Sequence, residues 1–88
     1  MPTIIAHHTI ENQAHWLASP KRKELFGTIG VTEIKTFVDP RNPTHVGVMM
    51  NVPDMDAFSA IMQSAAGAEA MEHDGVVPES VVVLIEAP

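Results

Sequence analysis

Hydrophobic and β-branched residues gather in four short runs along this chain, and runs of this length and composition are typical of β-strands. The predicted strands are Thr3–Thr9, Val31–Val38, His45–Val52 and Val81–Ile85. In the first three, alternation assigns successive side chains to opposite faces of a sheet. The last is apolar at consecutive positions, which indicates a strand covered on both faces.

The first strand is followed by a segment with helix signals. Asn12 is placed to cap a helix over Gln13–Ala18, and Ser19-Pro20 interrupts that helix. Proline suits a first helical turn, so a second helical piece is expected over Pro20–Phe26.

A second helical segment begins after the third strand, at Pro53-Asp54. Its apolar residues follow the i, i+3, i+4, i+7 spacing of a buried stripe, and they are Phe58, Ile61, Met62 and Ala65. We expect a break between Ser64 and Gly67, then a last turn over Ala68–His73 that ends at Gly75.

The two middle strands are joined by Asp39-Pro40-Arg41-Asn42-Pro43, a sequence rich in turn formers that predicts a hairpin. The order of elements is then strand-helix-strand-strand-helix-strand. We predict a single α+β domain over residues 1–88, with the ferredoxin-like βαββαβ order. Four antiparallel strands would carry the helices on one face.

Composition adds a partner to this picture. The chain has 88 residues and 9.5 kDa, of which 45% are hydrophobic, and a chain this short exposes much of its surface when it folds alone. The helices cover only one face of the sheet, yet Val81–Ile85 is apolar throughout. We therefore expect a homodimer in which a second copy covers the free face, sheet against sheet.

Charge and cysteine content exclude several classes of function. A net charge of −6 with five Lys and Arg argues against nucleic acid as a partner. The chain has no cysteine, which excludes a disulfide framework and a thiolate nucleophile. No signal peptide and no apolar run of about 20 residues are visible, so we expect a cytoplasmic protein without a membrane association.

Several motifs together resemble a known family. Four segments are similar to those of the dimeric α/β-barrel superfamily, whose members pair sheet to sheet into a barrel. They are the opening His8-Thr9-Ile10-Glu11-Asn12-Gln13-Ala14-His15-Trp16, the hairpin around Asp39–Pro43 with Val46-Gly47-Val48, the helix start Asp54–Phe58 and the ending Met71–Val76. The superfamily includes cofactor-independent antibiotic-biosynthesis-type monooxygenases, polyketide cyclases, haem-degrading enzymes and proteins without a known activity. One departure is Asn12, which stands where the motif usually has Asp.

His8 and Trp16 are the first candidate pair for chemistry. A neutral imidazole in a half-buried cleft can act as a general base, and Trp16 can line a pocket for an aromatic ligand. The alternative is structural, with Trp16 in the core and His8 as its hydrogen-bonded neighbour. The direction of His8 separates the two: an enclosed pocket shared with Trp16 favours catalysis.

The third strand supplies a second candidate set, because His45, Met49 and Asn51 share one of its faces. Asn51 is an amide in an apolar strand and can hold an oxyanion, while His45 and Met49 would contact the ligand. The alternative is that Asn51 caps the following helix or ends the strand.

Other polar residues receive structural interpretations. We expect no cofactor, and no metal site, because His8, His45 and His73 lack metal-ligand spacing. Lys21-Arg22-Lys23 is expected on a solvated helix face, with the attraction of an anionic ligand group as the alternative. Asp74 is expected among surface charges, and His73 at a helix end where an imidazolium is favourable.

Two functions remain open from the sequence. The first is a small enzyme, such as a cofactor-independent oxygenase, cyclase or isomerase, acting on an aromatic or polyketide-like molecule. There His8 would move a proton, Asn51 would hold an oxyanion and Trp16 would line the pocket. The second is a non-catalytic dimeric module that binds a small apolar ligand or a protein.

Overall fold

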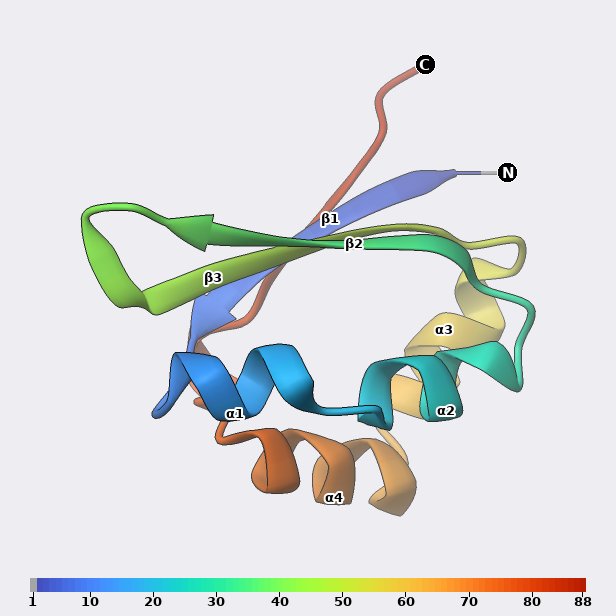
Figure 1. The fold of residues 1–88 in the computed structure, drawn as a ribbon. Coiled ribbons are helices and arrows are strands. Elements are labelled where there is room, and N and C mark those ends of the chain that lie inside the picture. Colours follow the sequence, from blue (N-terminus) through green and yellow to red (C-terminus); the bar gives the residue numbers. More distant parts are fainter. Residues whose placement is uncertain (1) are drawn as a thin grey trace.

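The computed structural model describes residues 2–88 and consists of one sheet with all helices on one side of it (Figure 1). The elements are β1 (Thr3–Thr9), α1 (Gln13–Ala18), α2 (Lys21–Gly27), β2 (Thr32–Asp39), β3 (Asn42–Asn51), α3 (Met55–Met62), α4 (Ala65–Asp74), the 3₁₀ helix η1 (Pro78–Ser80) and β4 (Val82–Ile85). The strands are antiparallel in the order β2-β3-β1-β4. This is the predicted α+β, ferredoxin-like fold.

The helix boundaries follow from their caps. The Asn12 side chain accepts a hydrogen bond from the His15 backbone N–H, as predicted. Asp54 and Ser64 cap α3 and α4 in the same way, so the second helical segment is two helices and α4 begins at Ala65 rather than Ala68. Gly75 ends α4 in the left-handed conformation, which glycine adopts without a steric penalty.

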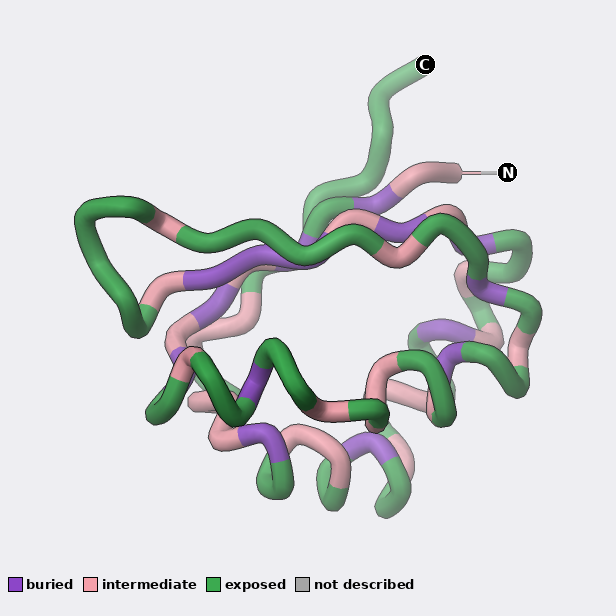
Figure 2. The backbone as a smooth tube through the Cα atoms, viewed as in Figure 1, coloured by how far each residue is buried: buried purple, intermediate pink, exposed green. Residues whose placement is uncertain are grey.

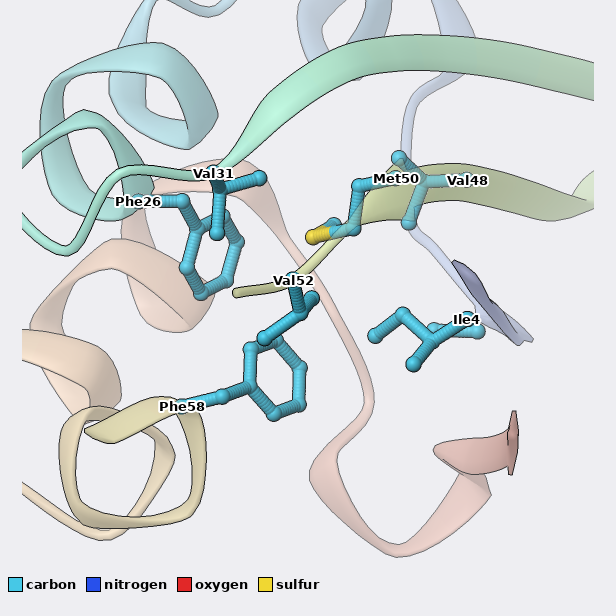
Figure 3. Close-up of a cluster of buried hydrophobic side chains, with 8 residues drawn as sticks. Ile4, Phe26, Val31, Val48, Met50, Val52 and Phe58 are labelled. Carbon is cyan, nitrogen blue, oxygen red and sulfur yellow. The ribbon is translucent and has the colours of Figure 1, made fainter. Parts of the chain in front are cut away.

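The main core lies between the sheet and the helices, where Ile4, Val48, Met50 and Val52 face Phe26 and Phe58 (Figure 3). The Phe26 and Phe58 rings stack with centroids 5.4 Å apart. A smaller cluster of Ile10, Trp16 and Val46 closes one end of this layer. Buried positions follow β1 and β3, while most of β2 is exposed (Figure 2).

The predicted alternation of β2 is wrong at its start. Thr32 pairs with Asn51 and Lys35 pairs with Met49, so β2 holds one extra residue between two positions of the same face. A bulge of this kind shifts the parity of the strand. Thr32 therefore lies on the face of Lys35 and Phe37, not on that of Thr36. Glu33, inside the bulge, has a positive φ of 56°.

Candidate functional site

His8 and Trp16 meet beneath the sheet, where β1 ends and α1 begins. Ile4, Ala6 and His8 of β1 point toward the helices and are buried. The His8 and Trp16 rings meet edge to face, with centroids 5.7 Å apart. Trp16 is 1% exposed and His8 is 7% exposed. The structure therefore brings together the first candidate pair, and its position between strand and helices is the one that an enclosed site requires.

Arg22 completes this cluster from α2. Its guanidinium carbon lies 4.3 Å from the centroid of the Trp16 ring, a cation–π arrangement. Its Nη1 lies 3.8 Å from Oδ2 of Asp74 in α4, and both side chains are largely buried. Trp16 thus contacts both the imidazole of His8 and the guanidinium of Arg22, so the indole brings a basic group and a cation close together.

These two charged residues were misassigned from the sequence. Arg22 was expected on a solvated helix face, and Asp74 was expected among surface charges, yet Asp74 is 4% exposed. Of this run, Lys21 and Arg22 both line the space between α2 and α4, which pack against each other, and only Lys23 is fully on the exposed side. The sequence signal that could have shown it is the Ser19-Pro20 break, which redirects the chain between α1 and α2.

A cavity of about 70 Å³ opens among these groups. Its walls are mainly apolar, and its polar lining comes from His8, Lys21, Arg22 and Asp74. The remaining walls include Trp16, Phe58, Met62 and Met71. The volume is about half of the ~150 Å³ of an engineered cavity that holds benzene. A single aromatic ring would therefore enter only with movement of the wall, and the flexible Met62 and Met71 side chains permit such movement.

Two polar atoms at this cavity have no hydrogen-bond partner among the described residues. They are Nδ1 of His8 and Nη1 of Arg22, and both are inaccessible to solvent. Buried polar atoms in folded proteins are nearly always paired. Because neither atom has accessible surface in this structure, a polar ligand group would bind them only after the walls of the cavity move.

Burial determines the charge of both groups. It lowers the pKa of His8 below its ordinary 6.5. A backbone hydrogen bond with Thr9 opposes this shift, and the positive charge of Arg22 adds to it. His8 is therefore neutral at pH 7. Burial also lowers the pKa of Arg22, which Asp74 opposes by favouring the charged form. The site thus combines a neutral base with a guanidinium in an apolar setting.

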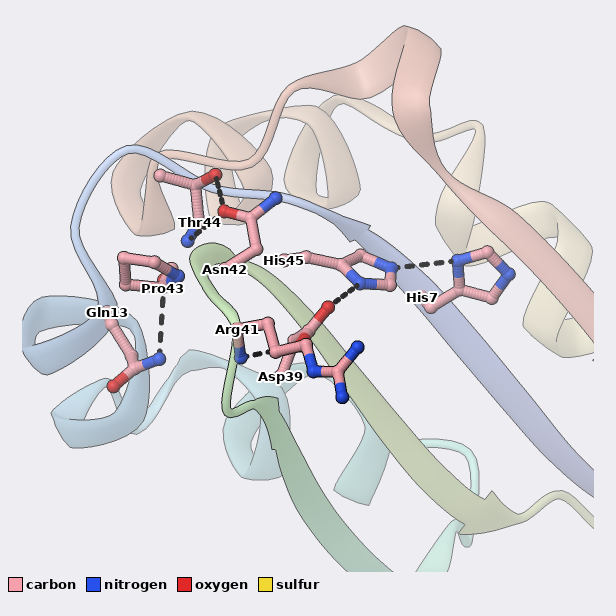
Figure 4. Close-up of polar contacts among 8 residues, drawn as sticks. All are labelled: His7, Gln13, Asp39, Arg41, Asn42, Pro43, Thr44 and His45. Atoms are coloured by element: carbon pink, nitrogen blue, oxygen red, sulfur yellow. Dashed lines mark hydrogen bonds and ion pairs between the residues drawn. The ribbon is translucent and has the colours of Figure 1, made fainter.

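The second candidate set lies on the opposite face of the sheet. His45 is hydrogen-bonded there to two side chains, with Nδ1 3.1 Å from Oδ2 of Asp39 and Nε2 3.3 Å from Nδ1 of His7 (Figure 4). The Arg41 backbone N–H donates to the same carboxylate. This hydrogen bond and the one from His45 lower the pKa of Asp39 below 3.8.

Asn51 and Met49 share this open face with His45, and Asn51 pairs with Thr3, at the far end of β1 from His8. The structure therefore does not place Asn51 in the site of His8 and Trp16. Its Oδ1 is buried without a hydrogen-bond partner among the described residues. The helix cap considered for Asn51 is supplied by Asp54.

The histidines do not converge into the three-histidine set considered from the sequence, because His8 and His45 lie on opposite faces. A different group forms at the junction of α1 and α4, where ligating atoms of His15, His73 and Asp74 lie within 4.8 Å of one another. These atoms already have partners: His73 Nδ1 is 2.9 Å from Oδ1 of Asp74, and His15 Nε2 is 2.6 Å from the His73 carbonyl. The group connects the outside of the molecule to the carboxylate that faces Arg22.

Solved structures with the same fold identify its class. An antibiotic biosynthesis monooxygenase superimposes with a TM-score of 0.64 at 18% identity, covering 100% of this chain and 98% of that one. A provisionally named antibiotic biosynthesis monooxygenase from Bordetella bronchiseptica gives a TM-score of 0.73 at 15% identity, over 99% and 95% of the two chains. A conserved protein from Methanosarcina mazei Go1 gives 0.62 at 11% identity, over 97% and 89%. The chain therefore has the ferredoxin-like fold of these proteins, and the resemblance drawn from the sequence is confirmed at the level of the fold.

Comparison of sequences adds no closer relative, because no family model and no curated protein matches this chain. Across residues 2–88, none of the helices has both the length and the hydropathy needed to cross a bilayer.

Proposed function

We propose that this protein is a small enzyme that acts on an aromatic or polyketide-like molecule without a cofactor, as a monooxygenase, cyclase or isomerase. The observation that carries the proposal is the cavity between sheet and helices, which is lined by a neutral His8 with an unpaired Nδ1 and by Trp16 beside it. The fold shared with proteins named as antibiotic biosynthesis monooxygenases supports the same class of reaction.

The chemistry assigned to His8 is proton transfer. A neutral imidazole with a free ring nitrogen can accept a proton from an acidic O–H or C–H of the substrate. The apolar walls exclude water, which strengthens electrostatic interactions in the cavity. Trp16 would form one wall against the substrate. The proposal gives Asn51 no part in this step, since it lies on the other face of the sheet.

We also propose that the protein is a homodimer assembled through the open face of the sheet. On that face Ile5, Phe37 and Leu84 are about half exposed, and they form an apolar surface next to His7 and Val82. An exposed apolar patch of this kind is typical of an interaction surface. A second copy of the chain offers the same patch, which fits the self-complementarity of a two-fold interface.

The test of the catalytic proposal compares two adjacent histidines. Wild-type protein, His8→Ala and His7→Ala are each incubated with a panel of phenols, hydroquinones and 1,3-diketones, and products are followed by mass spectrometry alongside dioxygen uptake. We expect turnover to be lost in His8→Ala and retained in His7→Ala, whose side chain lies on the other face. The oligomeric mass of each variant is checked in parallel.

Turnover by His8→Ala at the wild-type rate would remove His8 from the reaction. Product formation without dioxygen uptake would select the cyclase or isomerase. Binding of panel members without any turnover would favour the alternative, a non-catalytic module that uses the same cavity for a small ligand.

A further inference from the structure

We propose that the cavity is selective for anions and that Arg22 is the residue that binds the ionised oxygen of the ligand. The chemical class of ligand is then a small aromatic or conjugated molecule that carries a carboxylate, phenolate or enolate oxygen. This inference rests on the proposed function for the location of the site, and it adds the charge of the substrate and a second functional residue.

Arg22 has a hydrogen-bond donor without a partner among the described residues. Nη1 of Arg22 is buried without a hydrogen-bond partner among the described residues, and its nearest carboxylate oxygen, in Asp74, is 3.8 Å away. That distance is too long for a hydrogen bond. A guanidinium presents five N–H donors and no acceptor, so a group that completes its bonding must offer an acceptor atom. An anionic oxygen is the acceptor that binds it most strongly.

The lining of the cavity carries more positive than negative charge. The charged residues around the cavity are Lys21, Arg22 and Asp74, which leaves one net positive charge when His8 is neutral. Asp74 offsets only one of the two cations, and its other oxygen is bonded to His73. Lys21 is partly exposed and also borders a groove lined by Glu24 and Glu69, so the buried cation that an anion in the cavity would neutralise is Arg22.

Arg22 and His8 are both arranged around the indole of Trp16. The guanidinium lies over the indole ring, and the His8 imidazole meets that ring at its edge. Stacking of this kind fixes the plane of the guanidinium while leaving an edge free for a planar, two-oxygen group. His8 lines the same cavity, and its Nδ1 is unpaired but has no accessible surface in this structure. An oxygen that loses its proton to His8 would therefore arise beside the charge that stabilises it.

The experiment uses benzoate and benzamide, which match in size and shape and differ in charge. Trp16 is the only tryptophan of the chain, so its indole N–H gives one resolved signal in a nitrogen–proton correlation spectrum. Titration of this signal measures binding at the cavity. We expect benzoate to bind roughly 10- to 100-fold more tightly than benzamide, as a charge-assisted hydrogen bond predicts.

Three variants attribute the preference to a residue. We expect Arg22→Met to remove the preference, and Arg22→Lys to keep part of it because the charge remains. Lys23→Met is the matched control, since it removes the same charge from an exposed position outside the cavity, and it should keep the wild-type ratio. If Arg22→Met folds poorly, Arg22→Met combined with Asp74→Asn removes both buried charges and tests the same loss.

Equal binding of benzoate and benzamide to the wild type would overturn the anion selectivity and leave the proposed function standing, because the cavity would still take an aromatic ligand. An unchanged ratio in Arg22→Met, or a loss of preference in Lys21→Met alone, would overturn the role of Arg22. Failure of both probes to shift the Trp16 signal would count against the cavity itself, and so against the proposed function as well.

Discussion

The two faces of the sheet carry similar apolar side chains and differ in what covers them. Ile4 and Met50, on the helix side, are at most 1% exposed, whereas Phe37 and Leu84, on the open side, are 51% and 54% exposed. The helices account for this difference, since all of them lie on one side (Figure 1). The helices do not cover every strand, however. The expectation that the last strand is covered on both faces is wrong for the single protomer, because Val83 and Ile85 of β4, on the helix side, are 37% and 56% exposed.

The histidines of the two faces differ in their hydrogen bonding. On the exposed face, His45 has hydrogen-bond partners in both Asp39 and His7. On the covered face, Nδ1 of His8 is buried and without a partner in the described chain. A satisfied pair on a surface has a structural explanation, whereas an unsatisfied atom beside a cavity leaves a partner to be supplied from outside the protomer. Oδ1 of Asn51, on the open face, is also buried without a partner in the described chain. The cavity beside His8, and not the missing hydrogen bond alone, therefore supports the assignment of chemistry to the covered face.

The largest expected effect comes from replacing a phenylalanine by alanine on the covered face and comparing it with the same change on the open face. Phe58→Ala removes a buried ring that stacks on Phe26, and we expect it to lower the free energy of unfolding by about 3–5 kcal/mol. Phe37→Ala removes a ring that is half exposed in the protomer, and it should cost a dilute, monomeric sample less than about 1 kcal/mol. Urea denaturation measures both, and equal losses would contradict the contrast.

Leu84→Lys tests what covers the open face. If a second copy lies there, this change buries an unpaired charge in the interface, and we expect the dimer dissociation constant to rise at least about 100-fold. Sedimentation equilibrium measures this constant. Glu72→Lys, an exposed position of α4 in the helix layer, is the control and should leave the dimer intact. A wild-type chain that is monomeric at all concentrations would remove the dimer.

Asp74→Asn tests the buried ion pair on the covered face. It leaves the Arg22 charge without its carboxylate, and we expect a loss of about 1–3 kcal/mol in the free energy of unfolding. Glu72→Gln, on the same helix and exposed, should change stability by less than about 0.5 kcal/mol. If thermal and urea unfolding place Asp74→Asn level with this control, the Arg22–Asp74 contact has no energetic part in the fold.

The sequence was sufficient for the fold because its local signals agree with one another. The range of β1, the cap at Asn12 and the break near Ser64 are all confirmed. Each depends on residues within a few positions of one another. The bulge at Glu33 was missed because no glycine or proline within β2 marks it, and it depends on pairing with β3.

The candidate site was predictable only in part for the same reason. His8 and Trp16 are eight positions apart and joined by one turn, so their proximity follows from a strand that leads into a helix. Arg22 and Asp74 are far apart in the chain and meet through the packing of α2 on α4, which local pattern does not determine. Asn51 was grouped with His8 because alternation fixes faces within a strand and leaves the register between strands open.

The smallest expected effect is the pH dependence that separates the two faces. Because burial lowers the pKa of His8 in the folded state, the unfolded chain binds this proton more readily, and stability falls as pH drops below 6.5. The loss is complete once the pH is below the folded-state pKa. Asp39 has its pKa lowered from 3.8, so its contribution is present above that value and is lost only in stronger acid. His8→Asn should therefore flatten the decline of the urea midpoint between pH 7 and 5, as measured by circular dichroism. The same slope in His8→Asn as in the wild type would mean that the covered face holds no titrating histidine, and the contrast between the faces would then rest on packing alone.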